Sequence, residues 1–467
     1  MSVTKLIFLA VLALFSTMSV AEQSSLVEKK NKPFLSPVER YQHELMNLLI
    51  IVDAYCSTIY PKPTLAECID KVKHGVGNSF DPHSAYLNKF ELQSMIEENE
   101  GEFGGVGIEF KKSRDSFAPI VVADVPEGPG KRAGIFPGDV VTRITLGGTV
   151  FPAVSLSFEE AVRLVRGEVG SSVSITIMRA NETEPREFTL IRERIKVTQI
   201  TGRLLHENGK IYALITNLEF KKGNSTEMKQ MFEALNRQAG GKLSGLILNL
   251  ENNSGGLLYE AHNGIDLFLD VSNAILIRSN EGVRMYVPHH ENLIATLGDI
   301  TQGLPILVVV NGACASACEI LSASLKHFGR AVIAGTASTL GKGIVQSVFG
   351  TEAFGVDDGG GLSITTAEYL IGSPKDWIPV QCVGVKPDIV FEYPGLITDP
   401  FPKECDQVGH VKSNGVMPNA PLHLPIKEAN PKLYKAAEAM LRVFIKYQTP
   451  ILTEEVLKRK QEEQKEK

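Results

Sequence analysis

Ser316 lies in a run of small residues, "NGACASACEI" (311–320), directly after the apolar segment "PILVVV" (305–310). An α/β sheet presents reactive groups at such a place, because ligands bind beyond the carboxyl ends of its strands. A serine at the start of a helix lies beside free N–H groups, which can hold the negative charge of an attacked carbonyl. A serine there is also a common N-cap, so the segment indicates either a nucleophile or a plain helix start.

A serine nucleophile needs a base. The histidines occur singly apart from one adjacent pair, His289 and His290, and none lies in a catalytic phrase. A Ser-His-Asp triad therefore has little support. Lys342 in "GKGIVQ" (341–346) is the other candidate, with Gln346 four residues further on. Burial favours a neutral amine, which can accept a proton, and an uncharged glutamine can orient it without holding it as ammonium.

A second glycine-rich turn, "LNLENNSGGLL" (248–258), also follows an apolar strand and opens a helix. Strand ends of a parallel sheet meet at one edge, so this turn and Ser316 are expected to lie close together. The backbone N–H of Gly255 or Gly256, with that of Ala317, then forms a candidate oxyanion hole.

The elements that must position these residues change character along the chain. Residues 101–195 contain short alternating strands and one helix at 157–167, which predicts a small β-rich module. From residue 196 onward buried strands alternate with helices, which predicts a largely parallel sheet covered on both faces. Helices are also expected at 36–52, 64–75 and 431–446, a last strand at 388–393, and a solvated helix or disordered end at 454–467.

Composition and the first residues indicate an exported soluble protein. The chain has 467 residues, 43% hydrophobic and 22% charged, with a net charge of −6, which does not favour nucleic acid as a partner. Residues 1–21 have the anatomy of a signal peptide: Lys5, a short apolar stretch and small residues up to Ala21. An uncleaved anchor is the alternative, although the apolar stretch is short for a membrane span.

Six cysteines form three neighbouring couples, Cys56/Cys68, Cys314/Cys318 and Cys382/Cys405. Local disulfides are plausible for the first and third couples, although connectivity cannot be read from sequence. Cys314 and Cys318 are expected to remain two small buried thiols, because a disulfide across Ser316 would distort its turn. No Cys or His cluster has zinc-site spacing, so neither a metal nor a cofactor is expected.

The order of these segments resembles the carboxy-terminal processing proteases, also called tail-specific proteases. The similar segments are "DPHSAYL" (81–87), "GEFGGVGIEF" (101–110), "AGIFPGDVVTRI" (133–144), "GLILNLENNSGGLL" (245–258), "ACASACEILSASLKHFGRAVIAG" (313–335), "GKGIVQ" (341–346) and "GVKPDIV" (384–390). The resemblance implies an α/β fold: a crotonase/ClpP-like β/α protease core with an inserted β-rich PDZ domain and helical N- and C-terminal segments.

The resemblance also assigns roles. It implies Ser316 as nucleophile, Lys342 as base with Gln346 as its partner, and Ala317 with Gly255 or Gly256 as the oxyanion hole. Glu319 and Thr339 match positions that the family often uses around the site. In the PDZ domain, it implies that a loop binds the substrate's terminal carboxylate and a helix lines an apolar pocket; the corresponding residues are Gly105, Val106, Gly107, Ile108, Val162 and Val165.

The resulting expectation is a periplasmic endopeptidase that recognises apolar C-terminal tails of proteins. Its predicted parts are a signal peptide (1–21), a helical region (22–100), a PDZ domain (101–195), a protease core (196–396) and a helical tail (397–467). An adaptor lipoprotein and a homo-oligomer are left open. Changes around the site, such as Glu251 and Glu368 where the family commonly has basic residues, motivate the alternative of an inactive PDZ scaffold. A crotonase-like enzyme acting on acyl thioesters is a second alternative, without a nucleotide-binding motif to support it.

Overall fold

The computed structural model describes residues 52, 56, 64–112, 120–124, 127–180, 182–270, 274–279, 282–285, 298–372, 376–394, 402–406 and 430–465. The chain divides into two compact units, Met1–Gly75 and Val76–Lys467. The first unit contains the Cys56–Cys68 disulfide and most of α4 (Leu65–Gly77), which matches the helix predicted at 64–75. The predicted signal peptide and nearly all of the helix predicted at 36–52 lie outside the described residues.

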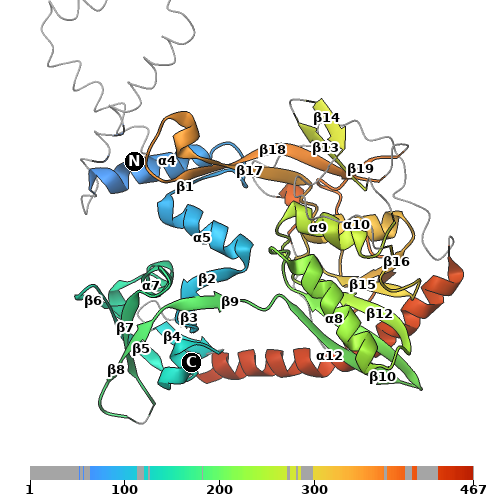
Figure 1. The fold of residues 1–467 in the computed structure, drawn as a ribbon, viewed down its shortest axis with the longest axis horizontal. Coiled ribbons are helices and arrows are strands. Elements are labelled where there is room, and N and C mark those ends of the chain that lie inside the picture. Colours follow the sequence, from blue (N-terminus) through green and yellow to red (C-terminus); the bar gives the residue numbers. More distant parts are fainter. Residues whose placement is uncertain are drawn as a thin grey trace, which may run out of the picture. The chain divides into compact units, whose positions relative to one another are not determined.

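The second unit is built around a six-stranded sheet with the order β10-β11-β12-β15-β16-β20 (Figure 1). Its strands are β10 (Ile200–Glu207), β11 (Lys210–Asn217), β12 (Leu243–Asn249), β15 (Ile306–Val310), β16 (Ala331–Gly335) and β20 (Ile389–Val390). Every neighbouring pair is parallel except the β10–β11 hairpin. The predicted, largely parallel sheet is therefore confirmed.

Helices cover both faces of this sheet (Figure 1). One face packs against α8 (Asn224–Gln238), α9 (Leu258–Asp266) and α10 (Ala317–His327), and the other packs against α12 (Pro431–Lys465). In β15, Val308 belongs to the first core and Val309 to the second, and neither is exposed. Burial on both faces explains why these strands are continuous apolar runs.

A second, antiparallel sheet carries the residues that follow Lys342, and the sequence analysis did not predict it. Its strands are β1 (Ala85–Leu87), β13 (Ile275–Ser279), β14 (Gly282–Met285), β17 (Ile344–Gly350), β18 (Gly361–Ile371) and β19 (Ile378–Pro379), with η2 (Thr351–Phe354) between β17 and β18. β1 pairs with β18, which brings the segment 81–87 to the lysine-bearing loop. After β1, α5 (Lys89–Glu100) begins at a capping box formed by Asn88 and Glu91.

The β-rich module has a core of its own, which includes Ile144 and Ile175. One sheet has the order β3-β4-β5-β7-β8, with β6 beside β5, and β2 pairs with β9. The bounds are β2 (Glu102–Gly105), β3 (Glu109–Lys112), β4 (Ile120–Asp124), α6 (Pro129–Ala133), β5 (Val140–Leu146), β6 (Thr149–Pro152), η1 (Ala153–Ser155), α7 (Phe158–Val165), β7 (Ser172–Met178), β8 (Arg186–Ile191) and β9 (Glu193–Lys196). Ser157 caps α7, as predicted.

Two predicted elements need correction. The strand expected at 388–393 is only Ile389–Val390, because its partner β16 ends at Gly335 and the chain then turns to pack Phe391 and Tyr393 in the α12 core. The helix expected at 431–446 continues as α12 to Lys465, through Pro450. Among the described residues, none of the helices combines the length and apolarity that a membrane crossing requires.

Candidate active site

Ser316 occupies a strained turn between β15 and α10. Its backbone has φ 52° and ψ −117°, and α10 begins at the next residue, Ala317. A positive φ is uncommon for a residue with a side chain and costs about 1–3 kcal/mol, so the surrounding contacts must enforce it. The Ser316 N–H donates to the carboxylate of Glu319, 2.9 Å away. The turn places Ser316 at the N-terminus of a helix and leaves it only half-buried, so a substrate can reach the hydroxyl.

Glu319 connects the serine turn to the lysine loop. One of its oxygens, Oε2, accepts from the N–H groups of both Ser316 and Lys342, each at 2.9 Å. The backbone nitrogen atoms of the two residues are therefore no further apart than twice that distance. The other, Oε1, accepts from the Gly341 N–H at 2.7 Å and from the Thr339 hydroxyl. Burial raises the pKa of this fully buried carboxyl to about 7, while its four donors oppose the rise.

A second group, Tyr369, also spans both loops. Its hydroxyl lies 2.5 Å from the carbonyl oxygen of Lys342 and 3.3 Å from that of Ser316. Tyr369 belongs to β18 and is 1% exposed, so its ring fixes the loops against the second sheet. Neither Tyr369 nor the bridging role of Glu319 was derived from the sequence.

Lys342 lies in the loop between β16 and β17, and its surroundings act on the amine in opposite directions. Burial lowers the pKa of Lys342, and the charges of Glu404, Glu319 and Asp81 oppose this effect, leaving the pKa below its ordinary value. A lowered pKa is what a basic amine needs near neutral pH. Within the described part of the chain, no hydrogen bond joins the Lys342 amine to the Ser316 hydroxyl, so the dyad stays a prediction.

Gln346 lies on β17, which pairs with β18. β18 also pairs with β1, which forms the end of the motif "DPHSAYL" (81–87). Its side-chain amide donates to the Thr365 hydroxyl at 3.1 Å, and that hydroxyl donates to Asp81 at 3.2 Å. Asp81 is itself fixed by the Ser84 hydroxyl at 2.5 Å. Gln346 is thus bonded to Thr365, and its predicted contact with the lysine amine is not among the described hydrogen bonds.

The glycine turn after β12 lies directly against the nucleophile. A Cβ on Gly255 would come within 2.8 Å of the Ser316 Cβ and 3.0 Å of the Ala317 nitrogen. The Gly255 N–H donates to the Asn253 side chain at 2.9 Å and is therefore occupied. Among the described hydrogen bonds, the N–H groups of Gly256 and Ala317 have no acceptor, which favours Gly256 as the partner of Ala317 in an oxyanion hole.

The profile of peptidase family S41 matches residues 211–391. The carboxy-terminal-processing protease of Bartonella bacilliformis is 31% identical over 336 residues, which cover 71% of this chain and 71% of that protein. The chain belongs to peptidase family S41. Membership confirms the predicted class of enzyme, a serine-type peptidase, and the predicted α/β protease fold, and it does not favour the inactive scaffold.

Two further proteins are similar to this S41 peptidase. The chloroplastic carboxyl-terminal-processing peptidase 2 of Arabidopsis thaliana is 32% identical over 70% of this chain and 61% of its own length. The solved structure of a photosystem II D1 C-terminal processing protease is 26% identical, covers 75% of this chain and 88% of its own, and superposes with a TM-score of 0.41.

The predicted peptide-binding residues of the S41 peptidase lie at the end of β2, in the loop from β2 to β3, and on α7. Gly105 ends β2, Gly107 has φ 64°, and Ile108 directly precedes β3. Val106 is 1% exposed and belongs to the module's core. On α7, Val162 is half-buried, whereas Val165 is 5% exposed and lies in the same core as Val106. Ile108 and Val162 are thus the apolar candidates with accessible surface.

The cysteines beside the nucleophile differ from the prediction. Cys314 and Cys318 form a disulfide, with Cα atoms 5.7 Å apart, instead of two free thiols. Positions four apart across the start of a helix have the separation that a disulfide needs, and the bond spans the strained turn at Ser316. Both side chains are fully buried, and the Cys314 carbonyl accepts from the Leu340 N–H in the lysine loop at 2.9 Å.

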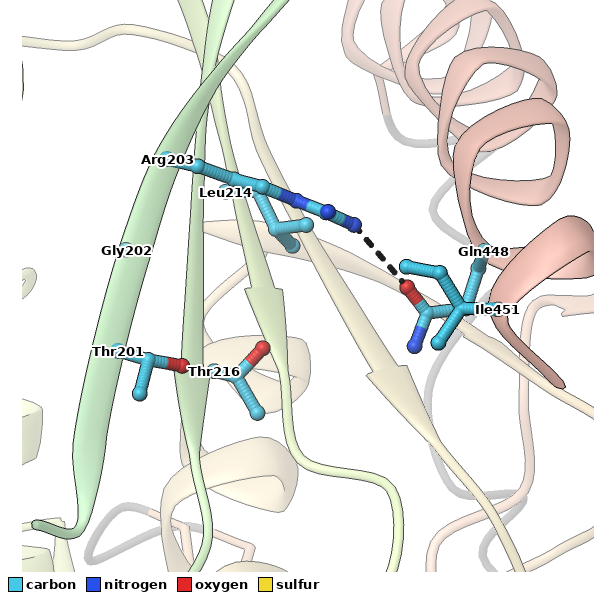
Figure 2. Close-up of a pocket in the computed structure, with 7 residues that line it drawn as sticks. All are labelled: Thr201, Gly202, Arg203, Leu214, Thr216, Gln448 and Ile451. Atoms are coloured by element: carbon cyan, nitrogen blue, oxygen red, sulfur yellow. Dashed lines mark hydrogen bonds between the residues drawn. The ribbon is translucent and has the colours of Figure 1, made fainter. Parts of the chain in front are cut away.

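Figure 2 shows a pocket between β10, β11 and α12, apart from these residues. Its lining residues are Thr201, Gly202, Arg203, Leu214, Thr216, Gln448 and Ile451. Arg203, the charged residue of the set, donates to the Gln448 side chain at 3.3 Å. The lining contains no pair of nucleophile and base, so the pocket offers no competing active site.

Proposed function

We propose that this S41 peptidase is an exported endopeptidase that cleaves proteins with apolar C-terminal tails by means of a Ser316–Lys342 dyad. The observation that carries the proposal is the Glu319 carboxylate, because one of its oxygens, Oε2, accepts from the backbone N–H groups of both residues. This common acceptor supports the dyad, because it keeps the backbone of Lys342 close to that of Ser316 at the N-terminus of α10.

The reaction follows from the groups in place. Neutral Lys342 takes the proton of the Ser316 hydroxyl, and the oxygen attacks the substrate carbonyl. The N–H groups of Ala317 and Gly256 hold the oxyanion, and the ammonium then returns its proton to the leaving amine. Lys342 next activates a water that hydrolyses the acyl-enzyme. The flexible stem of Lys342 allows the amine to swing toward the hydroxyl when substrate binds.

Tail recognition is assigned to the β-rich module, taken as a PDZ domain. β3 stands at the edge of its described sheet, with β4 as neighbour, so an extended peptide can add a strand there. The N–H groups of the 105–108 loop can receive the terminal carboxylate, while Ile108 and Val162 contact an apolar last residue.

Export is supported by the three disulfides, because such bonds persist in oxidising compartments.

The proposal is tested with a folded reporter protein ending in an apolar tail and a matched reporter ending in two aspartates. Wild type is expected to cleave the apolar-tailed reporter faster, and Ser316→Ala and Lys342→Ala to lose at least about 10³-fold in kcat/KM. Val162→Asp should raise KM for the apolar tail with little change in kcat. Equal cleavage by wild type and either dyad variant would overturn the dyad, and equal cleavage of both reporters would overturn tail recognition.

A further inference from the structure

A short turn from the C-terminal region, residues 402–406 with η3 (Glu404–Asp406), is bonded to the loop that carries Lys342. The Glu404 N–H donates to the Leu340 carbonyl at 3.1 Å. The Lys403 ammonium donates to the Thr339 carbonyl at 2.9 Å. These bonds fix the turn to the residues that lead into Lys342.

The Glu404 side chain reaches the other side of the lysine. Its carboxylate is fully buried, lies 2.8 Å from His83 Nε2 and accepts from the Gln381 amide at 3.5 Å. Gln381 in turn accepts from the Gly343 N–H at 2.7 Å. Glu404 is therefore connected to the lysine loop on both sides, at Leu340 and at Gly343, and Lys342 lies between them.

A covalent bond holds this turn in place. Cys405, adjacent to Glu404, forms a disulfide with Cys382, adjacent to Gln381. Cys382 has φ 65°, a conformation unfavourable for a residue with a side chain, and its N–H donates to the Gly341 carbonyl at 2.8 Å. The bond joins the two residues beside the Glu404–Gln381 contact.

We propose that Glu404, fastened by the Cys382–Cys405 disulfide, is a positioning residue for the Lys342 base. The inference rests on the proposed function in that it takes Lys342 as the base. When the amine accepts the serine proton it becomes an ammonium in a buried site, and a fixed carboxylate nearby stabilises that charge. The same carboxylate also favours the ammonium before the reaction begins. It therefore raises the pH at which the amine becomes neutral.

Several other titratable groups share this environment. Glu319 and Asp81 also act on the Lys342 amine, and both favour its charged form. His83 contacts Glu404, and the phenol of Tyr369 faces the charges of Glu319 and Glu404. A change at Glu404 alone therefore tests one of three carboxyls around the amine.

The first test compares pH profiles of kcat/KM for wild type and Glu404→Gln on the apolar-tailed reporter. Glutamine keeps the shape and the acceptor oxygen but removes the charge. Without the negative charge the neutral amine forms at lower pH, so the acidic limb of the kcat/KM profile is expected to move to lower pH. The plateau of kcat/KM is expected to fall. The ratio of kcat/KM in the variant to that in wild type should therefore be about tenfold higher on the acidic limb than on the plateau. Asp406→Asn, an exposed carboxylate of the same turn, should leave the profile unchanged. An unmoved limb in Glu404→Gln would overturn the inference.

The second test removes the bond. Cys382→Ser/Cys405→Ser is expected to move the limb in the same direction, and adding Glu404→Gln should produce no further shift, since coupled changes are not additive. Cys56→Ser/Cys68→Ser, which opens the disulfide of the first unit, is the matched control and should keep the wild-type limb. Fully additive shifts would show that the disulfide does not place Glu404.

Failure of the inference differs from failure of the proposed function. If Lys342→Ala retains wild-type cleavage, lysine is not the base and the proposed function fails. If Lys342→Ala is inactive while Glu404→Gln keeps the wild-type limb, only the role of Glu404 fails. Thermal unfolding of each variant shows whether it has folded. If the cysteine variant does not fold, the pH profile of Glu404→Gln still tests whether Glu404 acts on Lys342.

Discussion

Gly255 shows, at the scale of single residues, how tightly the oxyanion turn fits the nucleophile. Its φ is 110°, and an added Cβ would collide with the Ser316 Cβ at 2.8 Å. Gly255→Ala is expected to displace the serine and lower kcat by about 10²-fold or more, because small misplacements of reacting groups are costly. Gly282→Ala is a matched control: its φ is 119°, but its Cβ would meet open space, so activity should persist. Equal activity in the two variants would contradict the packing described.

Glu319 offers a second test at the scale of single residues. Both of its oxygens accept hydrogen bonds, so the amide N–H groups of a glutamine at this position would face groups that also donate. Glu319→Gln is expected to lose about 1–3 kcal/mol of unfolding free energy and also to lower kcat, since both dyad backbones lose their shared acceptor. Glu260→Gln is the control, because Glu260 is also buried and accepts from Gly223 and Ser225, whose contacts serve α8. It should lose stability but keep kcat. A Glu319→Gln protein with wild-type kcat would remove Glu319 from the account.

The sequence indicated some of these residues and not others, for a physical reason. Ser316 and Lys342 stand in local phrases after buried strands, which makes them recognisable. Glu404 and His83 gain their positions only by meeting across 321 residues of chain. No local pattern carries that contact.

At the scale of elements, the Cys314–Cys318 disulfide spans the turn that joins β15 to α10. Cys314→Ala/Cys318→Ala is expected to lower kcat about tenfold, because the strained Ser316 turn loses a covalent restraint. The unfolding midpoint should fall by only a few degrees, since a disulfide closing so short a loop contributes little entropy. Cys56→Ala/Cys68→Ala should keep kcat. A large loss of stability without loss of kcat would mean that the bond serves the core alone.

The sequence predicted strands and helices best where the apolar pattern was strong. The strands of the parallel sheet are buried on both faces, so their continuous apolar runs were diagnostic. The second sheet was missed because β18 is half-buried over most of its length and pairs with β1 nearly 300 residues away, as in the contact of Ala85 with Ser363. Its order depends on tertiary pairing and not on local periodicity.

At the scale of the whole molecule, buried carboxyls make stability depend on pH. Burial raises the pKa of Glu251 from 4.5 to about 7 and that of Asp266 from 3.8 to about 6. A carboxyl whose pKa is raised by folding stabilises the native state below its unfolded pKa, and that stabilisation is lost as pH rises through the folded value. These two carboxyls are therefore expected to contribute a fall of the unfolding midpoint between about pH 5 and pH 7.

Glu251→Gln isolates one of these groups. The glutamine can still accept from the Tyr393 hydroxyl, which lies 2.7 Å from the carboxylate, but it does not ionise. The variant should show a shallower fall of the midpoint with pH, whereas Glu392→Gln, at an exposed site, should follow wild type. Identical slopes in wild type and Glu251→Gln would contradict a raised pKa at Glu251.

The most direct measurement of the central claim, that Lys342 activates Ser316, is the rate at which a serine-reactive phosphonate modifies the enzyme, followed by intact mass. Wild type is expected to gain one adduct, mapped to Ser316, at a rate that rises with pH as the amine loses its proton. Lys342→Ala should react at least about 10²-fold more slowly while keeping its unfolding midpoint. An adduct that forms on Ser316 equally fast without the lysine would contradict the claim.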